Sequence, residues 1–200
     1  HLIIPEGYSL AWSGQFEYMQ RAIEKLKLVV PFTILIITLL LYLAFKRVAD
    51  VLIVLVSLPV SIAGSAWFLW YLDYELSVAV AVGIIALAGV SVEIGVIMLI
   101  YLNQYRDEYI NEAKLNNSFS GLRAAIGNGA LQRLRPIVMT VAAITAGLLP
   151  IMFGHGTGSE VMQRIAAPMI GGMVTTLLLT LCVIPALYFI WQKWWLRKQI

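Results

Sequence analysis

A single acidic side chain lies inside a long apolar stretch of the sequence. Glu93 is the only charged residue in the run from Leu76 to Leu102. On a helix centred on this run it lies roughly 6 Å from the bilayer centre, where an acid costs at least ~2.5 kcal/mol to insert. Small residues on its helical face would let a neighbouring helix approach closely, and they are Ala79, Ala86 and Gly89. Glu93 is therefore predicted to point into a helix bundle, either as a proton-carrying carboxylate of a transporter or as a protonated, structural hydrogen-bond donor.

A second group of side chains has the chemistry to bind a soft metal ion. Met162, Met169 and Met173 are spaced seven and four residues apart, so they project in similar directions from a helix. Thioether sulfur suits Cu(I), and by extension Ag(I). Methionine also fills gaps in apolar cores, and the spacing by itself favours this packing role for all three.

The remaining reactive side chains give no indication of an enzyme. His155 lies in the glycine-rich stretch 154–158 and is predicted to be a solvated loop residue. Cys182 is the only cysteine, which excludes a disulfide framework, and its apolar surroundings predict a packing role. The sequence contains no HExxH, CxxC or Gly-x-Ser-x-Gly motif. The glycine-rich stretch also lacks the Lys-Ser/Thr of a phosphate-binding loop.

The elements that must position these residues are membrane-spanning helices. Hydrophobic residues make up 60% of the chain and charged residues 12%, which are too few charges for a soluble domain and too many apolar residues for a disordered chain. A helix of about 20 apolar residues crosses the hydrocarbon core. Five runs meet this requirement, so we predict an all-α membrane fold with transmembrane helices at about residues 28–45, 51–72, 76–102, 136–153 and 165–191.

The basic residues predict how these helices are oriented. Most of the 14 lysines and arginines flank one side of the predicted spans, which the positive-inside rule places in the cytoplasm. Residues 1–27 then lie outside and the C-terminus inside. Tryptophan and tyrosine residues near the ends of the second and fifth spans fit interfacial belts. The net charge of +3 reflects this asymmetry and gives no reason to expect nucleic-acid binding. The ten residues on the cytoplasmic side are Lys46, Arg47, Arg106, Lys114, Arg123, Arg133, Arg135, Lys193, Arg197 and Lys198.

Segments outside the spans are also predicted to be ordered. Alternating apolar residues in 5–14 predict a strand at the edge of a domain that the chain lacks, and residues 15–27 a short amphipathic helix leading into the first span. Residues 118–131 are predicted to form an amphipathic helix along the membrane surface. The chain begins at His1 without a signal-peptide pattern, so it is predicted to be a fragment.

Three stretches of the sequence resemble the resistance–nodulation–division superfamily, in its heavy-metal efflux branch. They are AGVSVEIGVIMLIY at 88–101, LRPIVMT at 134–140, and the run from 156 to 172. Residues 5–27 also resemble the end of the family's periplasmic porter domain. The resemblance covers nearly the whole chain and implies that it holds the last five helices of a twelve-helix transporter.

The resemblance implies a homotrimeric pump in the inner membrane of Gram-negative bacteria. Such a pump exchanges protons for metal ions and works with a periplasmic adaptor and an outer-membrane channel, and no cofactor is implied. Glu93 matches an acid of the proton relay in copper/silver members. Met162 matches a methionine that passes the ion along just above the membrane, and zinc, cobalt and nickel members lack this methionine. Cu(I)/Ag(I) is therefore the implied cargo, while Met169 and Met173 remain assigned to packing.

One position departs from the copper/silver pattern. Members similar to this chain carry a lysine directly after the Arg-Pro pair, where this sequence has Ile137. The substitution leaves Glu93 without an obvious cation, since Arg133 and Arg135 lie at the predicted cytoplasmic end. A divalent-ion pump for zinc, cobalt or nickel, and a structural membrane module that transports nothing, therefore remain as alternatives.

Overall fold

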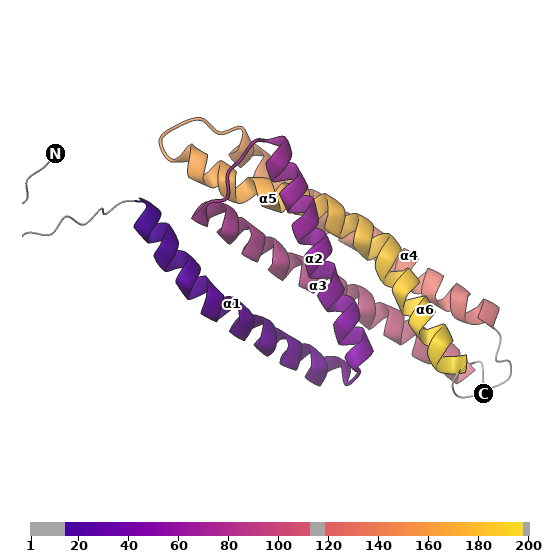
Figure 1. The fold of residues 1–200 in the computed structure, drawn as a ribbon. Helices are drawn as coiled ribbons and strands as arrows, with labels where there is room; N and C mark the ends of the chain where they lie inside the picture. Colours follow the sequence, from indigo (N-terminus) through magenta and orange to yellow (C-terminus); the bar gives the residue numbers. More distant parts are fainter. Residues whose placement is uncertain (1–14, 113–118, 198–200) are drawn as a thin grey trace, which may run out of the picture. The chain divides into compact units, whose positions relative to one another are not determined.

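The computed structural model describes residues 15–112 and 119–197, and these are almost entirely helical (Figure 1). The chain divides into two compact units, residues 1–37 and 38–200, and the first helix begins in one unit and ends in the other. The strand predicted at residues 5–14 lies outside the described residues. The helices are α1 (Gln15–Phe45), α2 (Val48–Tyr71), α3 (Val78–Glu112), α4 (Phe119–Met152), α5 (Ser159–Leu178) and α6 (Ile184–Arg197), and a π-helical turn, η1 (Leu179–Val183), joins the last two.

The prediction of an all-α membrane fold with five spans is confirmed. Five helical stretches are long and apolar enough to cross a membrane, judged by length and composition alone. The described chain is therefore a multi-pass membrane segment. The stretches are Gln20–Phe45, Val48–Tyr71, Val78–Glu108, Gly121–Met152 and Ser159–Trp194.

Two helices extend further than hydropathy predicts. α3 continues past its predicted end at Leu102 to Glu112. α4 is continuous from Phe119 to Met152, so the prediction of a separate surface helix at 118–131 is wrong, and its described part is the beginning of α4. Pro136 does not end the helix, because a proline removes only one backbone donor and membrane helices tolerate this loss.

α5 is the helix around which the second unit packs. It contacts α2, α3 and α4, and small residues let the helices come close. A Cβ atom added at Gly172 would lie 2.1 Å from Leu87 Cδ2, and one added at Gly171 would lie 2.3 Å from Phe68 Cβ. Such close approach is how membrane helices associate where lipid offers no hydrophobic driving force.

Buried hydroxyl groups join the same helices. Ser57, Ser61 and Ser65 recur every four residues on the buried face of α2. Ser65 Oγ donates a hydrogen bond to the carbonyl oxygen of Pro168 on α5 (2.7 Å). Ser91 on α3 and Thr176 on α5 share a hydrogen bond of 3.1 Å. The hydroxyls of Ser65, Ser91 and Thr176 therefore link one helix to the next, whereas Ser57 and Ser61 donate to carbonyl oxygens of α2 itself.

A wider turn carries α5 into α6. In η1 the N–H of Ile184 donates to the carbonyl oxygen of Leu179, five residues back. The next residue is Pro185, which has no N–H to donate. The step from four-residue to five-residue hydrogen bonds therefore falls next to a position where the regular helix would lose a bond in any case. The predicted span at 165–191 lies wholly within this α5–η1–α6 stretch.

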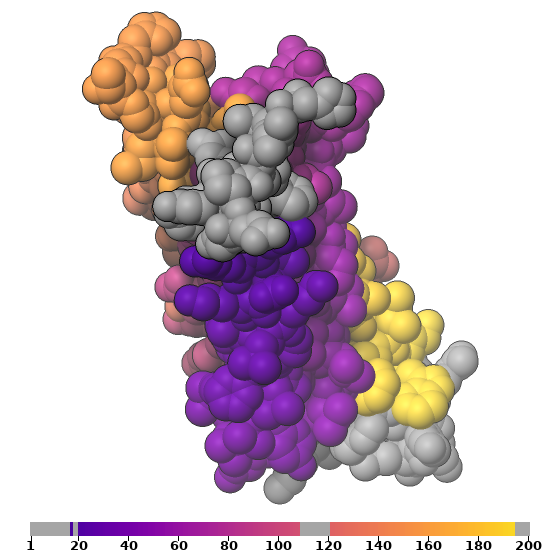
Figure 2. All heavy atoms as spheres, turned by 60° about the vertical axis from the view of Figure 1, so that its left-hand side comes forward, coloured from indigo at the N-terminus to yellow at the C-terminus, as the bar shows by residue number. Residues whose placement is uncertain are grey.

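The second unit has two ends. The end that carries the α2–α3 and α4–α5 connections is called the loop end, and the end that carries the Lys46–Arg47 turn and the last residues of α6 is called the turn end. Figure 2 shows the region around the α4–α5 connection (orange) and α6 (yellow) at opposite ends of the unit. Trp67, Trp70 and Trp194 are exposed at these ends, as predicted for interfacial aromatic residues.

A Gly83→Ala substitution is expected to destabilise the full-length protein by about 1–3 kcal/mol, the usual range for overpacking. The added Cβ would lie 2.3 Å from the carbonyl oxygen of Ile165, a backbone atom that cannot rotate away. Gly127→Ala is the matched control, because a Cβ there meets nothing within 4 Å. Thermal unfolding of the two purified variants checks the prediction, and an equal melting temperature for both would contradict the close contact between α3 and α5.

Candidate functional site

Glu93 lies midway along α3 on a face that the described helices leave open. Its side chain is exposed, as are Ala86 and Gly89 on the same face. A Cβ added at Gly89 would meet nothing within 4 Å. Among the described residues Glu93 makes no hydrogen bond or ion pair. Within the described segment Glu93 and the small residues beside it face away from the other helices. That Glu93 points into a helix bundle therefore stays a prediction about the longer transporter.

The described helices also offer Glu93 no cation. Ile137, at the position of the family's lysine, is buried in the core. The guanidinium carbon of Arg133 lies 3.7 Å from the centre of the Tyr101 ring. Tyr101 is roughly 12 Å further along α3 than Glu93 at ~1.5 Å per residue. The expectation that this segment would not supply a charge partner for Glu93 agrees with these positions.

Met162 lies in the first turns of α5, beside the glycine-rich connection at the loop end. Gly156 and Gly158 have φ angles of 149° and 88°, a region that favours glycine. Ser159 Oγ donates to the carbonyl oxygen of Gly156, and Gln163 Nε2 donates to that of Gly154, both at 2.8 Å. The connection is therefore tied back onto α5 on both sides of Met162.

The Met162 side chain is 57% exposed, so its sulfur can meet an ion arriving from outside the segment. The part of the chain that the structure describes contains no group of three His, Cys, Asp or Glu side chains able to hold a metal. His155 is exposed in the connection, as predicted.

The other sulfur-containing residues separate from Met162 in the structure. Met173 is fully buried and Met169 is half-buried, which confirms a packing role for Met173. Cys182 is exposed, so its predicted packing role within this segment is wrong. Apolar neighbours in the sequence do not distinguish a residue that faces the bundle from one that faces lipid.

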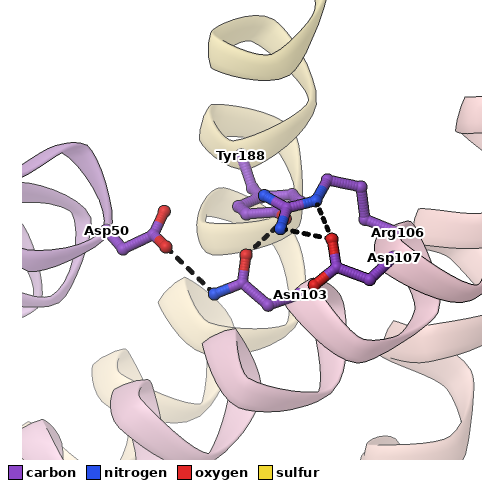
Figure 3. A network of polar contacts seen from close by, with 5 residues as sticks. All are labelled: Asp50, Asn103, Arg106, Asp107 and Tyr188. Atoms are coloured by element: carbon purple, nitrogen blue, oxygen red, sulfur yellow. Dashed lines mark hydrogen bonds and ion pairs between the residues drawn. The ribbon is translucent and has the colours of Figure 1, made fainter. Parts of the chain in front are cut away.

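A buried polar cluster at the turn end was not predicted from the sequence. Asn103 Nδ2 on α3 donates to Asp50 Oδ2 on α2 (2.9 Å), and the Tyr188 hydroxyl on α6 donates to Asn103 Oδ1 (2.6 Å). Figure 3 shows these side chains meeting from three helices. Asp50 is only 1% exposed. It was missed because the apolar run that defines the second span begins one residue later, at Val51.

Arg106 completes this cluster from α3. Its side chain is 3% exposed, yet Nε and Nη2 both donate to Asp107 Oδ1 (2.9 and 2.6 Å), on a side chain that is 60% exposed. Asp50 Oδ1 and Arg106 Nη1 are buried without a hydrogen-bond partner among the described residues. A sequence signal for Asp50 existed, since it precedes the buried Ser57, Ser61 and Ser65 of α2 at helical spacing.

A family model described as the AcrB/AcrD/AcrF family matches residues 1–192. The chain belongs to the AcrB/AcrD/AcrF family. This finding confirms the resemblance to resistance–nodulation–division transporters that the sequence motifs indicated. The family's transmembrane segment accounts for the five apolar helices of the structure.

Similar proteins place the chain near heavy-metal members of this family. It is 53% identical over 195 residues to the putative cation efflux system protein SilA of Salmonella typhimurium and 52% identical over 195 residues to the cation efflux system protein CusA of Escherichia coli K12. In each case the match covers 96% of this chain and 18% of the relative. The cobalt-zinc-cadmium resistance protein CzcA of Cupriavidus metallidurans is 37% identical over 185 residues, covering 92% of this chain and 16% of CzcA.

A solved structure agrees with the fold. The crystal structure of a heavy metal efflux pump, crystal form II, matches with a TM-score of 0.78 and 34% identity, over 95% of this chain and 18% of that one. The chain therefore spans less than a fifth of the length of the proteins it matches.

Proposed function

We propose that this chain is the C-terminal membrane segment of a proton-driven pump that exports Cu(I) or Ag(I) from a Gram-negative cell. The observation that carries the proposal is Glu93, an acid midway along a membrane helix on a face lined by small residues and left open by the described helices. An intramembrane acid is costly unless it serves transport or finds a partner. An open face of small residues suits close contact with another helix.

In this proposal the open face of α3 receives a helix from the rest of the pump. The Glu93 carboxylate takes up a proton that enters from outside and releases it towards the cytoplasm. Each cycle adds one proton to the carboxylate and removes it again, so the side chain changes charge without any covalent chemistry. The cation that the family's lysine supplies is absent at Ile137, and we infer that the missing half of the pump or bound water stabilises the charged carboxylate.

Met162 supports the choice of ion. Its exposed thioether at the loop end is a soft ligand, which favours Cu(I) and Ag(I) over harder divalent ions. The identity to the cation efflux system proteins SilA and CusA is also higher than the identity to CzcA, which is named for cobalt, zinc and cadmium resistance. A divalent-ion pump remains the second candidate because Ile137 departs from the copper/silver pattern.

The orientation and the partners follow from the same proposal. The turn end, which carries Lys46, Arg47 and the basic residues of α6, lies in the cytoplasm, and the loop end with Met162 lies in the periplasm. The pump forms a homotrimer in the inner membrane and works with a periplasmic adaptor and an outer-membrane channel. Metal taken up at the periplasmic side or from the membrane leaves through that channel.

Resistance profiles test the proposal. The full-length pump, expressed with its adaptor and channel in a host that lacks its own copper and silver exporters, is expected to raise tolerance to silver and copper but not to zinc or cobalt. Tolerance to zinc or cobalt alone would replace the proposal by the divalent-ion pump. Normal membrane expression with no change for any of the four metals would favour the structural module.

A further inference from the structure

Two opposite charges are buried at the turn end, and each has an atom left without a partner. Asp50 Oδ1 and Arg106 Nη1 make no hydrogen bond within the described chain, although their side chains are almost fully buried. Asp50 bonds to Asn103, which accepts from the Tyr188 hydroxyl, and Arg106 lies in the same cluster (Figure 3). A buried charge without a counter-charge is strongly destabilising. The two unfilled atoms are complementary, since one is an acceptor and the other a donor.

Hydrogen bonds in the cluster point towards Asp50. The Tyr188 hydroxyl donates to Asn103, and Asn103 in turn donates to Asp50 (Figure 3). This chain of donors ends on one oxygen of the Asp50 carboxylate, Oδ2. The other oxygen, Oδ1, is buried and receives no donor among the described residues.

Arg106 is better placed than other basic residues to pair with Asp50. Its present partner, Asp107, is largely in solvent, where an ion pair contributes little to stability. Arg47 lies three residues before Asp50 in the sequence, but its side chain is exposed. Only Arg106 combines burial with a free donor in this cluster.

We propose that Asp50 and Arg106 form a buried charge pair, direct or through one water molecule, that fixes the turn end of α3 against α2 and α6. Both Asn103 and Arg106 belong to α3, the helix that carries Glu93. At 100° per residue, Arg106 projects about 140° away from Glu93 around the α3 axis. The pair thus holds α3 from the side opposite Glu93 and keeps the Glu93 face turned towards the rest of the pump. Asp50, Arg106 and Tyr188 are positioning residues in this scheme, and their effect on transport rests on the proposed function.

The test compares single and paired neutral variants of the full-length pump. Asp50→Asn and Arg106→Gln are each expected to lower the melting temperature by about 5 °C or more, because each leaves one buried charge uncompensated. The double variant is expected to recover most of that loss, because neither charge remains. Asp50→Asn combined with Arg47→Gln should show no recovery. Asp107→Asn is the matched control, since it removes only the exposed partner of Arg106 and should leave the melting temperature within about 1 °C.

Transport by the same variants separates positioning from folding. Per folded pump, the single variants are expected to lose roughly tenfold in the maximal rate of silver export with an unchanged KM, because metal binding lies at the other end of the segment. The double variant should return to within about threefold of the unmodified pump. Tyr188→Phe keeps the ring and removes the hydroxyl, and it should lower the maximal rate in the same direction.

Several results would overturn the proposal. Additive losses in the double variant would show that Asp50 and Arg106 are not paired, as would recovery through Arg47→Gln. A loss in Asp107→Asn equal to that in Asp50→Asn would identify Asp107 as the true partner of Arg106. If the single variants do not fold, the yield of folded protein replaces the melting temperature. Recovery of that yield in the double variant supports the pair, and no recovery contradicts it. If the double variant recovers its melting temperature but not its rate of silver export, the two residues are paired but the pair does not position α3. The melting temperatures test the pairing even if the pump transports no metal. A failure of the proposed function can therefore be told apart from a failure of the pairing.

Discussion

The Glu93→Gln substitution is expected to abolish metal export by the full-length pump. Glutamine has almost the shape of glutamate, and its amide can still form hydrogen bonds. It cannot bind and release a proton as a carboxyl group does. Because Glu93 is exposed on the described segment and makes no hydrogen bond or ion pair there, the change should leave the packing of α3 against α2, α4 and α5 intact. Silver and copper tolerance should fall to that of cells without the pump, while membrane expression and trimer formation persist.

Glu75→Gln is the control for this prediction. Glu75 is an exposed acid in the α2–α3 connection at the loop end, so its loss changes the charge of the protein by the same amount without touching the intramembrane face. Tolerance should stay unchanged in that variant. Undiminished resistance in Glu93→Gln would remove Glu93 from the mechanism. Infrared difference spectra add a direct observation, because a relay acid changes protonation when metal or a pH gradient is applied and a structural acid does not.

The Met162→Ile substitution is expected to weaken silver and copper export several-fold without loss of folded protein. Isoleucine is of similar size but has no sulfur to bind a soft ion. The side chain is more than half exposed at the start of α5, so few packing contacts depend on it. Uptake of silver into inverted membrane vesicles measures the effect, and the metal concentration needed for half-maximal rate should rise.

Met139→Ile serves as the matched control for Met162. Met139 is exposed on α4 to a similar degree, 65%, but lies away from the glycine-rich connection. Export by this variant should match that of the unmodified pump. If silver export survives Met162→Ile unchanged, the methionine carries no ion and the inference from the copper/silver members fails.

The helices could be predicted because their signal is local. Apolar runs of roughly the length needed to cross the bilayer core identify the five spans, and the structure has a helix at each. The exact ends were less predictable. Hydropathy ends a span at the first charges, so it placed the third boundary at Leu102, although α3 continues to Glu112. It also begins a span at a proline, although α4 passes through Pro136 without a break.

The polar cluster at the turn end could not be predicted, because it depends on contacts between distant segments. Asn103 and Tyr188 are separated by 85 residues and Asp50 and Asn103 by 53, and no local pattern pairs them. The surroundings of Glu93 could not be predicted from the sequence either. Its small-residue face indicated a helix contact, but the sequence does not say whether the contacting helix lies in this segment, and the described residues leave that face open.

Metal-stimulated proton movement tests the central claim most directly. The full-length pump, reconstituted in vesicles with a pH-sensitive dye inside, is expected to carry protons down an imposed pH gradient faster when Ag(I) or Cu(I) is present, and not when Zn(II) is added. The Glu93→Gln variant should remove this stimulation while Glu75→Gln retains it. Metal transport that proceeds at the same rate without a pH gradient, or stimulation that persists in Glu93→Gln, would contradict a proton-driven pump acting through Glu93.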